Sequence, residues 1–118
     1  MMKPSAALVV LGAALLGIAA TVPGRAQQAG QEDRGRQVFE YWCAPCHAPG
    51  PKHPGTQALE ALYRGAKPAP LEQRNDLAPS ETKYFVRNGV SIMPPFRKTE
   101  ITDAELAALA AYLAPKHQ

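Results

Sequence analysis

The sequence predicts an all-α fold of three to five helices joined by long loops. Apolar residues recur at helical spacing in several segments, whereas no segment shows the apolar–polar alternation of a half-buried strand and no internal repeat is present. The connecting segments are rich in proline and glycine and are long for the helices they join. Such loops suggest that the chain wraps around something other than its own side chains.

The first 26 residues have the features of a secretory signal peptide. Lys3 supplies a positive charge, residues 6–20 form an uncharged apolar run, and small residues lead to Ala26, after which we expect cleavage. The alternatives are an uncleaved anchor or a buried helix, but the apolar run is shorter than the ~20 residues of a spanning helix. We therefore expect a signal peptide over residues 1–26 and one domain over residues 27–118. The mature protein would be periplasmic, with no membrane span.

The charge balance of the mature chain is close to neutral. Cleavage would remove two of the 13 basic residues, so the formal charge of +3 would fall to about +1. The remaining Lys and Arg residues are scattered among acidic residues, which excludes a nucleic-acid footprint. Both cysteines would survive, and a domain this small commonly needs a metal or a cross-link. Because an exported protein can form disulfides, the state of these cysteines is the first question.

The first predicted helix leads into the two cysteines. A loose polar segment over residues 27–31 precedes Asp33, a residue suited to cap a helix start. The helix then runs to about residue 43, with Val38, Phe39 and Trp42 on one side.

Three further helices are expected. Thr56 is predicted to cap a short helix that ends near residue 63, and residues 79–88 form a helix opened by a proline and closed by a glycine. Thr102 and Glu105 form a capping box at the start of the last helix, which ends near residue 113. The side chains expected to face inward are Tyr84, Phe85, Val86, Leu106, Leu109, Ala110 and Leu113.

Cys43 and Cys46 are separated by two residues and followed by His47, which is the C-x-x-C-H pattern of haem c attachment. Two intervening residues set the sulfurs at the separation of the two haem vinyl groups, with which they would form thioether bonds. His47 would then lie under the iron and bind it through Nε2. A backbone carbonyl should hold its Nδ1, and we expect that of Pro54 or Pro51.

Three other interpretations of this motif stay open. A disulfide oxidoreductase can show the same pattern, but places it between a strand and a helix in a βαβ unit. A structural zinc site needs four ligands, and the further histidines, His53 and His117, lie at no usual finger spacing. The third alternative is a plain structural disulfide.

Met93 is the candidate for the second axial iron ligand. It would be the only methionine left after signal cleavage, and it precedes two prolines that hold the backbone extended. A lone methionine often only fills a core, but this rigid segment can direct a thioether sulfur toward a metal. His53 is the rival ligand. It lies only six residues after His47, and we interpret it as an exposed loop residue.

The motif, followed late in the chain by Met93 and a proline, resembles the class I mono-haem cytochromes c. The resemblance covers about residues 33–113, and includes Gly35 and Phe39 in the first helix and Leu109 and Tyr112 in the last. It implies the class I cytochrome c fold, in which those residues pack the two helices across each other. It also implies one covalent haem c, iron ligated by His47 and Met93, and a role in electron transfer.

A narrower resemblance concerns residues 86–89 together with Met93, Pro94 and Phe96. These residues are similar to the small cytochrome subunit of p-cresol methylhydroxylase-type flavocytochromes. The resemblance implies that a periplasmic flavin- or quinone-dependent dehydrogenase donates electrons, which pass to a downstream acceptor. The chain departs from this pattern over residues 48–77.

If protein fills both axial positions, the expected role is electron carriage rather than catalysis. The alternatives are a haem enzyme or sensor with an open sixth position and a thiol–disulfide oxidoreductase without haem. We expect the electron to leave near the thioether edge of the haem, around Trp42, Ala44, Pro45 and Ile92. Three arginines, Arg64, Arg87 and Arg97, are interpreted as solvated surface charges.

Overall fold

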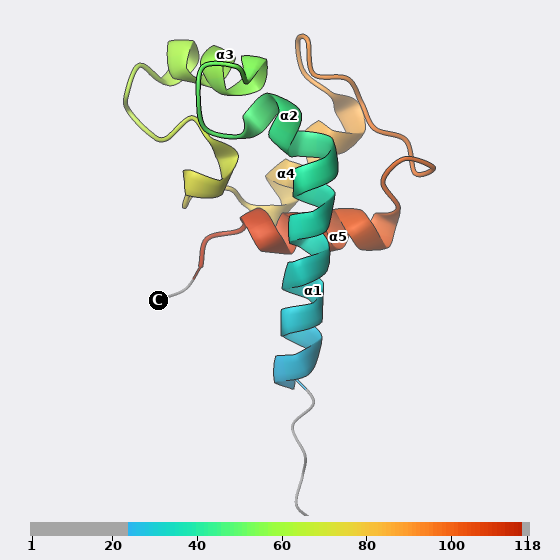
Figure 1. The fold of residues 1–118 in the computed structure, drawn as a ribbon. Helices are drawn as coiled ribbons and strands as arrows, with labels where there is room; N and C mark the ends of the chain where they lie inside the picture. Colours follow the sequence, from blue (N-terminus) through green and yellow to red (C-terminus); the bar gives the residue numbers. More distant parts are fainter. Residues whose placement is uncertain (1–23, 117–118) are drawn as a thin grey trace, which may run out of the picture.

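The computed structural model describes residues 24–116, and in this part all the secondary-structure elements are helices or helical turns, with no β-strand (Figure 1). This confirms the all-α prediction. The α-helices are α1 (Gly24–Val38), α2 (Ala44–His47), α3 (Pro54–Tyr63), α4 (Pro79–Asn88) and α5 (Asp103–Leu113). A π-helical turn, η1 (Phe39–Cys43), joins α1 to α2, and a short 3₁₀ turn, η2 (Leu71–Gln73), precedes α4.

The core forms where α1 crosses α5 (Figure 1). Gly35 permits this crossing, because a Cβ atom there would lie 2.3 Å from the carbonyl oxygen of Ala108. One turn later, Phe39 is almost fully buried and packs against the ring of Tyr112 at a centroid distance of 6.1 Å. The other buried members of the core cluster are Val38, Cys43, Leu77, Val86, Ile101, Leu106, Leu109 and Leu113.

Helix α1 already includes Gly24, the first residue that the structure describes, so the predicted start near Asp33 and the loose lead over residues 27–31 were both wrong. The segment is rich in Gln, Arg and Ala, which favour helix, and no proline interrupts it between residue 24 and the cysteines. Asp33 does not cap the helix; its carboxylate accepts a hydrogen bond from Arg36. Residues 1–23 lie outside the described part, so signal cleavage after Ala26 stays a prediction.

Helix α3 begins three residues earlier than predicted, because His53 rather than Thr56 precedes it and Pro54 occupies its first turn. Thr56 is therefore not its cap. The Thr56 side chain is fully buried, and its hydroxyl donates a 2.9 Å hydrogen bond to the carbonyl of Ala48. At the other end the chain reverses through Arg64, which has a φ of 49°.

The last two helices match the sequence prediction. Helix α4 has the expected bounds, and the capping box of Thr102 and Glu105 opens α5 with both of its hydrogen bonds present. Leu106, Leu109, Ala110 and Leu113 are buried as expected. The prediction was wrong for Tyr84, which is 61% exposed.

Among the described residues, no helix combines the length and the apolar composition needed to cross a membrane.

Candidate haem-binding site

The C-x-x-C-H motif begins at the last residue of η1, in the core, and continues through α2. The defining hydrogen bond of η1 runs from the N–H of Ala44 to the carbonyl of Phe39, one residue further back than in an α-helix. Cys43 is buried in the core and Cys46, one turn later, is exposed, and both thiols are free. Burial, with a smaller contribution from Cys46, raises the pKa of the Cys43 thiol to about 12.

These features bear on the alternatives to haem attachment. A reactive C-x-x-C thiol needs partial exposure and a lowered pKa, whereas Cys43 has neither. The described residues also contain no strand that could supply a βαβ context. Within residues 24–116, no group of three or more His, Cys, Asp or Glu side chains is placed to hold a metal ion.

The ring of His47 is packed so that Nδ1 is buried and has no hydrogen-bond partner within the described chain. The expected acceptor was the carbonyl of Pro54 or Pro51, and neither fills that role; the Pro51 carbonyl accepts from Gln57 instead. Helix α3 approaches so closely that a Cβ atom on Gly55 would lie 2.9 Å from Nδ1. Burial lowers the pKa of His47, so the ring is neutral at pH 7, the form that binds metals.

His53 helps to hold the motif, which differs from its interpretation as an exposed loop residue. Its side chain is half-buried, and its Nδ1 lies 3.1 Å from the carbonyl of Pro45, to which it donates. Together with the bond from Thr56 to Ala48, this contact fixes the loop over residues 48–53 against the motif. The sequence contained no signal for this contact beyond the presence of a histidine in the loop.

Met93 is held by a tight turn at the tip of the loop over residues 90–95. Its N–H donates to the carbonyl of Val90 at 2.9 Å, and its carbonyl accepts from the N–H of Val90 at 3.0 Å. Ser91 has a φ of 52°, as the first central residue of mirror-image hairpin turns does. Gly89 has a φ of 69°, and a Cβ atom there would lie 2.5 Å from the Met93 carbonyl oxygen. Only glycine suits that position.

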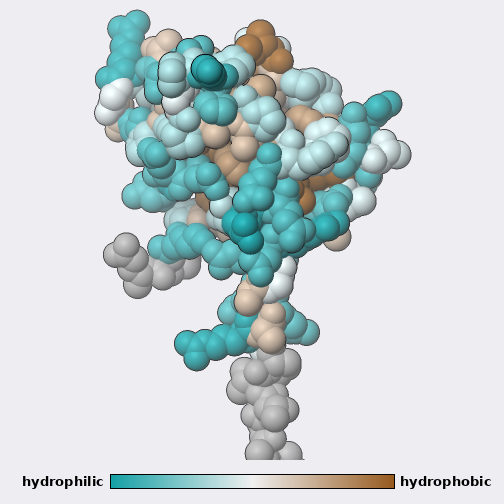
Figure 2. Space-filling view, viewed as in Figure 1, coloured by the Kyte–Doolittle hydropathy of each residue, from teal (hydrophilic) through white to brown (hydrophobic). Residues whose placement is uncertain are grey.

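Two adjoining cavities, which we call the slot, separate α2 and α3 from α4 and this loop. Their volumes are about 250 and 290 Å³. Both are lined by Cys43, His47 and Met93, and the larger also by Cys46. The slot therefore brings the four predicted site residues together. The remaining lining is mostly apolar, and Figure 2 shows apolar side chains at the top of the molecule near the loop tip, where Val90 and Ile92 are exposed.

Arg74 is a residue of the slot that the sequence did not indicate. Its side chain is only 5% exposed, lines the smaller cavity, and donates a 2.8 Å hydrogen bond to the Tyr63 hydroxyl. It also binds Asp76 through two hydrogen bonds of 2.7 and 2.9 Å. Nothing in the surrounding proline-rich segment distinguishes this arginine from a solvated one. It places a buried positive charge beside the slot.

The three arginines considered from the sequence differ in role. Arg64 and Arg97 are exposed, as expected. Arg87 is not a solvated charge: its guanidinium donates to the carbonyls of Phe96 and Ile101 at 3.0 and 2.8 Å and to the carboxylate of Asp103. Arg87 therefore ties the Met93 loop to the start of α5.

Asp76→Asn tests how firmly Arg74 is held. The hydrogen bonds from Arg74, with that from Lys67, keep the pKa of Asp76 well below its usual range. A carboxyl with a lowered folded-state pKa stabilises the fold above the unfolded pKa, near 3.9, and loses this contribution as the pH falls. Since Asp76 is 41% exposed, we expect a loss of only about 1 kcal/mol at pH 7. Denaturant unfolding should show this loss shrinking toward pH 3; an equal loss at both pH values would contradict the pairing.

The described residues fit a haem c group by the chemistry of their donors. Two thiols, an imidazole that is neutral at pH 7 and a thioether converge on an apolar slot. The helices around it form a small class I cytochrome c fold.

The comparison with protein families gives the same class. Residues 30–113 match the family described as "Cytochrome C oxidase, cbb3-type, subunit III", and the chain belongs to this family of cytochrome c domains. No curated protein matches the chain, and neither does any solved structure. The family makes the protein a c-type cytochrome, a haem-based electron carrier rather than an enzyme.

Proposed function

We propose that the protein carries one electron at a time through a single haem c. Cys43 and Cys46 would hold the haem through thioether bonds, and His47 and Met93 would ligate its iron. The bound haem supplies a one-electron Fe(III)/Fe(II) couple. The observation that carries this proposal is that His47 and Met93, from α2 and the loop over residues 90–95, line both cavities of the slot together with Cys43.

The surrounding chain would suit a carrier. Most of the side chains that line the slot are apolar, and these surroundings together with a methionine ligand favour a raised reduction potential. Core packing and the reciprocal hydrogen bonds of the turn hold Met93 in place, so a substrate would have to displace it to reach the iron. A haem enzyme or sensor would need that position open.

The partners are inferred from the sequence alone. The similarity of residues 86–96 to the cytochrome subunit of p-cresol methylhydroxylase-type flavocytochromes supports a flavin- or quinone-dependent dehydrogenase as electron donor. The N-terminal segment supports export to the periplasm, where such a donor would act. The matching family is named for a subunit of a cbb3-type oxidase, and a terminal oxidase is one class of downstream acceptor.

Mass spectrometry and a visible spectrum test haem attachment. Expressed with a c-type maturation system, the protein should be heavier than its processed polypeptide by one haem that survives acidic organic extraction. Replacing both Cys43 and Cys46 by Ala should abolish this covalent mass. Ser80→Ala, a control at an exposed residue of α4 that lines neither cavity, should keep it. A wild-type protein without haem, with free or disulfide-linked thiols, would reject the proposal in favour of the thiol–disulfide alternative.

A further inference from the structure

Three aromatic rings form a row from the slot to the surface at the junction of α1 and α2. Trp42 packs edge-on against Tyr41, with a centroid distance of 4.9 Å and an interplanar angle of 81°. On its other side it packs against Phe96 at 5.7 Å and 73°. Trp42 and Phe96 line the larger cavity, whereas Tyr41 lines neither and is 73% exposed. The row therefore connects the slot lining to solvent through contacts between rings.

The row is fixed to the motif and to the Met93 loop. Trp42 directly precedes Cys43 in η1, so covalent bonds join it to a residue that would hold the haem. Phe96 is anchored at both backbone groups, because its N–H donates to Val86 at 2.8 Å and its carbonyl accepts from Arg87. Trp42 is half-buried against the core, which accounts for its packing but not for the exposed ring of Tyr41 beside it.

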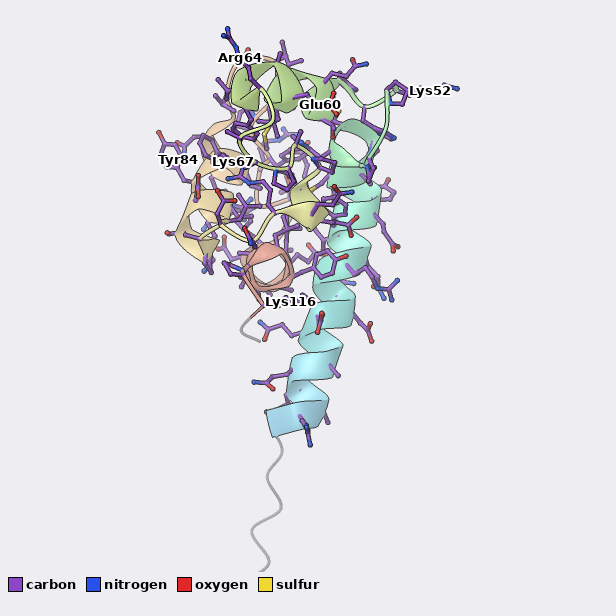
Figure 3. The ribbon with its side chains drawn as sticks, turned by 90° about the vertical axis from the view of Figure 1, so that its left-hand side faces the viewer. Lys52, Glu60, Arg64, Lys67, Tyr84 and Lys116 are labelled. Carbon is purple, nitrogen blue, oxygen red and sulfur yellow. The ribbon has the colours of Figure 1, made fainter. Side chains whose placement is uncertain are left out.

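A second aromatic pair provides a comparison within the same molecule. Tyr84 packs edge-on against Phe85 at 5.5 Å and 79°, and Phe85 lines the smaller cavity. Figure 3 shows Tyr84 at the outer edge of α4, with α1 on the opposite side of the molecule. Unlike Trp42, Phe85 is not joined by a peptide bond to a candidate haem-binding residue.

Resting on the proposed function, we propose that Trp42 and Tyr41 form an electron route separate from the mouth of the slot. One electron passes along it between the haem iron and a one-electron redox protein in contact with Tyr41. When the iron is the donor, it changes from Fe(II) to Fe(III), and the redox centre of the partner is reduced by one electron. No bond or proton is exchanged, and the aromatic rings only bridge the gap, with no net oxidation.

The route can be tested in the haem-containing protein with a thiol-reactive ruthenium photoreductant. Haem attachment consumes both native thiols, so an introduced cysteine is the only site of labelling. Gln37→Cys places the label four residues before Tyr41, and Ser80→Cys places it four residues before Tyr84; both positions are exposed. A light pulse then transfers one electron from ruthenium to Fe(III), and the visible spectrum of the haem reports the rate.

We expect Trp42→Leu to slow haem reduction several-fold from the label at position 37 and to leave the rate from position 80 unchanged. Trp42→Phe, which keeps a ring, should retain most of the rate. Tyr41→Ala should also slow reduction from position 37, and it does not threaten folding because the side chain is exposed. Tyr84→Ala is the matched control for Tyr41→Ala, because Tyr84 is also an exposed ring in an edge-on pair and lines neither cavity; it should not change the rate from position 37.

The sulfur-to-iron charge-transfer band should be the same in all these variants, since none removes an iron ligand. Because Trp42 lines the slot, the reduction potential of each variant is measured beside its rate, so that an effect of driving force can be told from the loss of the route. An unchanged rate from position 37 in both Trp42→Leu and Tyr41→Ala would overturn the route. If the route were overturned in this way but the label at position 80 still reduced the haem, the proposed electron carriage would stand without the aromatic route. Failure of both labels to reduce the haem would overturn the proposed function as well.

Discussion

Met93→Ala is expected to remove the sulfur-to-iron charge-transfer band from the far-red spectrum of the oxidised protein and to lower its reduction potential. Methionine is a soft ligand that favours Fe(II), and its removal leaves water or a nitrogen ligand in its place. We expect a fall of roughly 0.1 V or more, a fraction of the roughly 0.8 V over which axial ligands set haem potentials. Spectroscopy and a redox titration on the same sample measure both effects.

Ile92→Ala is the matched control for this experiment. Ile92 neighbours Met93 in the same turn but is 77% exposed, so its loss should leave the band and the potential close to those of the wild type. If Met93→Ala kept both properties, another residue would be the sixth ligand. His53 would then be examined first, although in the structure its ring is engaged with Pro45.

Local signals in the sequence predicted the last two helices well. The capping box of Thr102 and Glu105 sets the start of α5 within its own first turn, and the proline and glycine around residues 79–88 set both ends of α4. The start of α1 was missed, because Asp33 is suited to cap a helix, whereas the Gln, Arg and Ala residues before it favour helix despite the glycine at position 30. Tyr84 was misplaced because three consecutive apolar residues cannot all face inward from one helix.

In the site, too, residues marked by a local sequence pattern were predicted, whereas a residue that depends on tertiary contacts was not. Spacing along the chain identified Cys43, Cys46 and His47, and a single methionine beside two prolines identified Met93. The structure brings these four together in the slot, and their roles as ligands remain part of the proposal. Arg74 escaped notice because its burial depends on Tyr63 in α3, which meets it only after the proline-rich segment between them folds back.

Gly35→Ala is expected to be among the most destabilising single substitutions in the chain. The added Cβ would lie 2.3 Å from the Ala108 carbonyl oxygen and 2.6 Å from the Cβ of Tyr112. The backbone atom among these neighbours cannot rotate away, so α1 and α5 would have to separate. Overpacking costs about 1–3 kcal/mol and sometimes more, and the close approach to backbone atoms favours the upper end of this range. After the ~1 kcal/mol that alanine gains over glycine in a helix, the expected net loss of stability is about 2 kcal/mol.

For a domain of this size, each kcal/mol corresponds to roughly 4–8 °C in melting temperature, so we expect a fall of about 10 °C or more. Gly30→Ala is the matched control, because it lies in the same helix with nothing within 4 Å of its added Cβ. Its melting temperature should be unchanged or slightly raised. If Gly35→Ala and Gly30→Ala had the same melting temperature, the close crossing of α1 and α5 would not be what requires glycine at position 35. Phe39 and the start of the haem motif lie one and two turns beyond this crossing, so its geometry also sets where the slot begins.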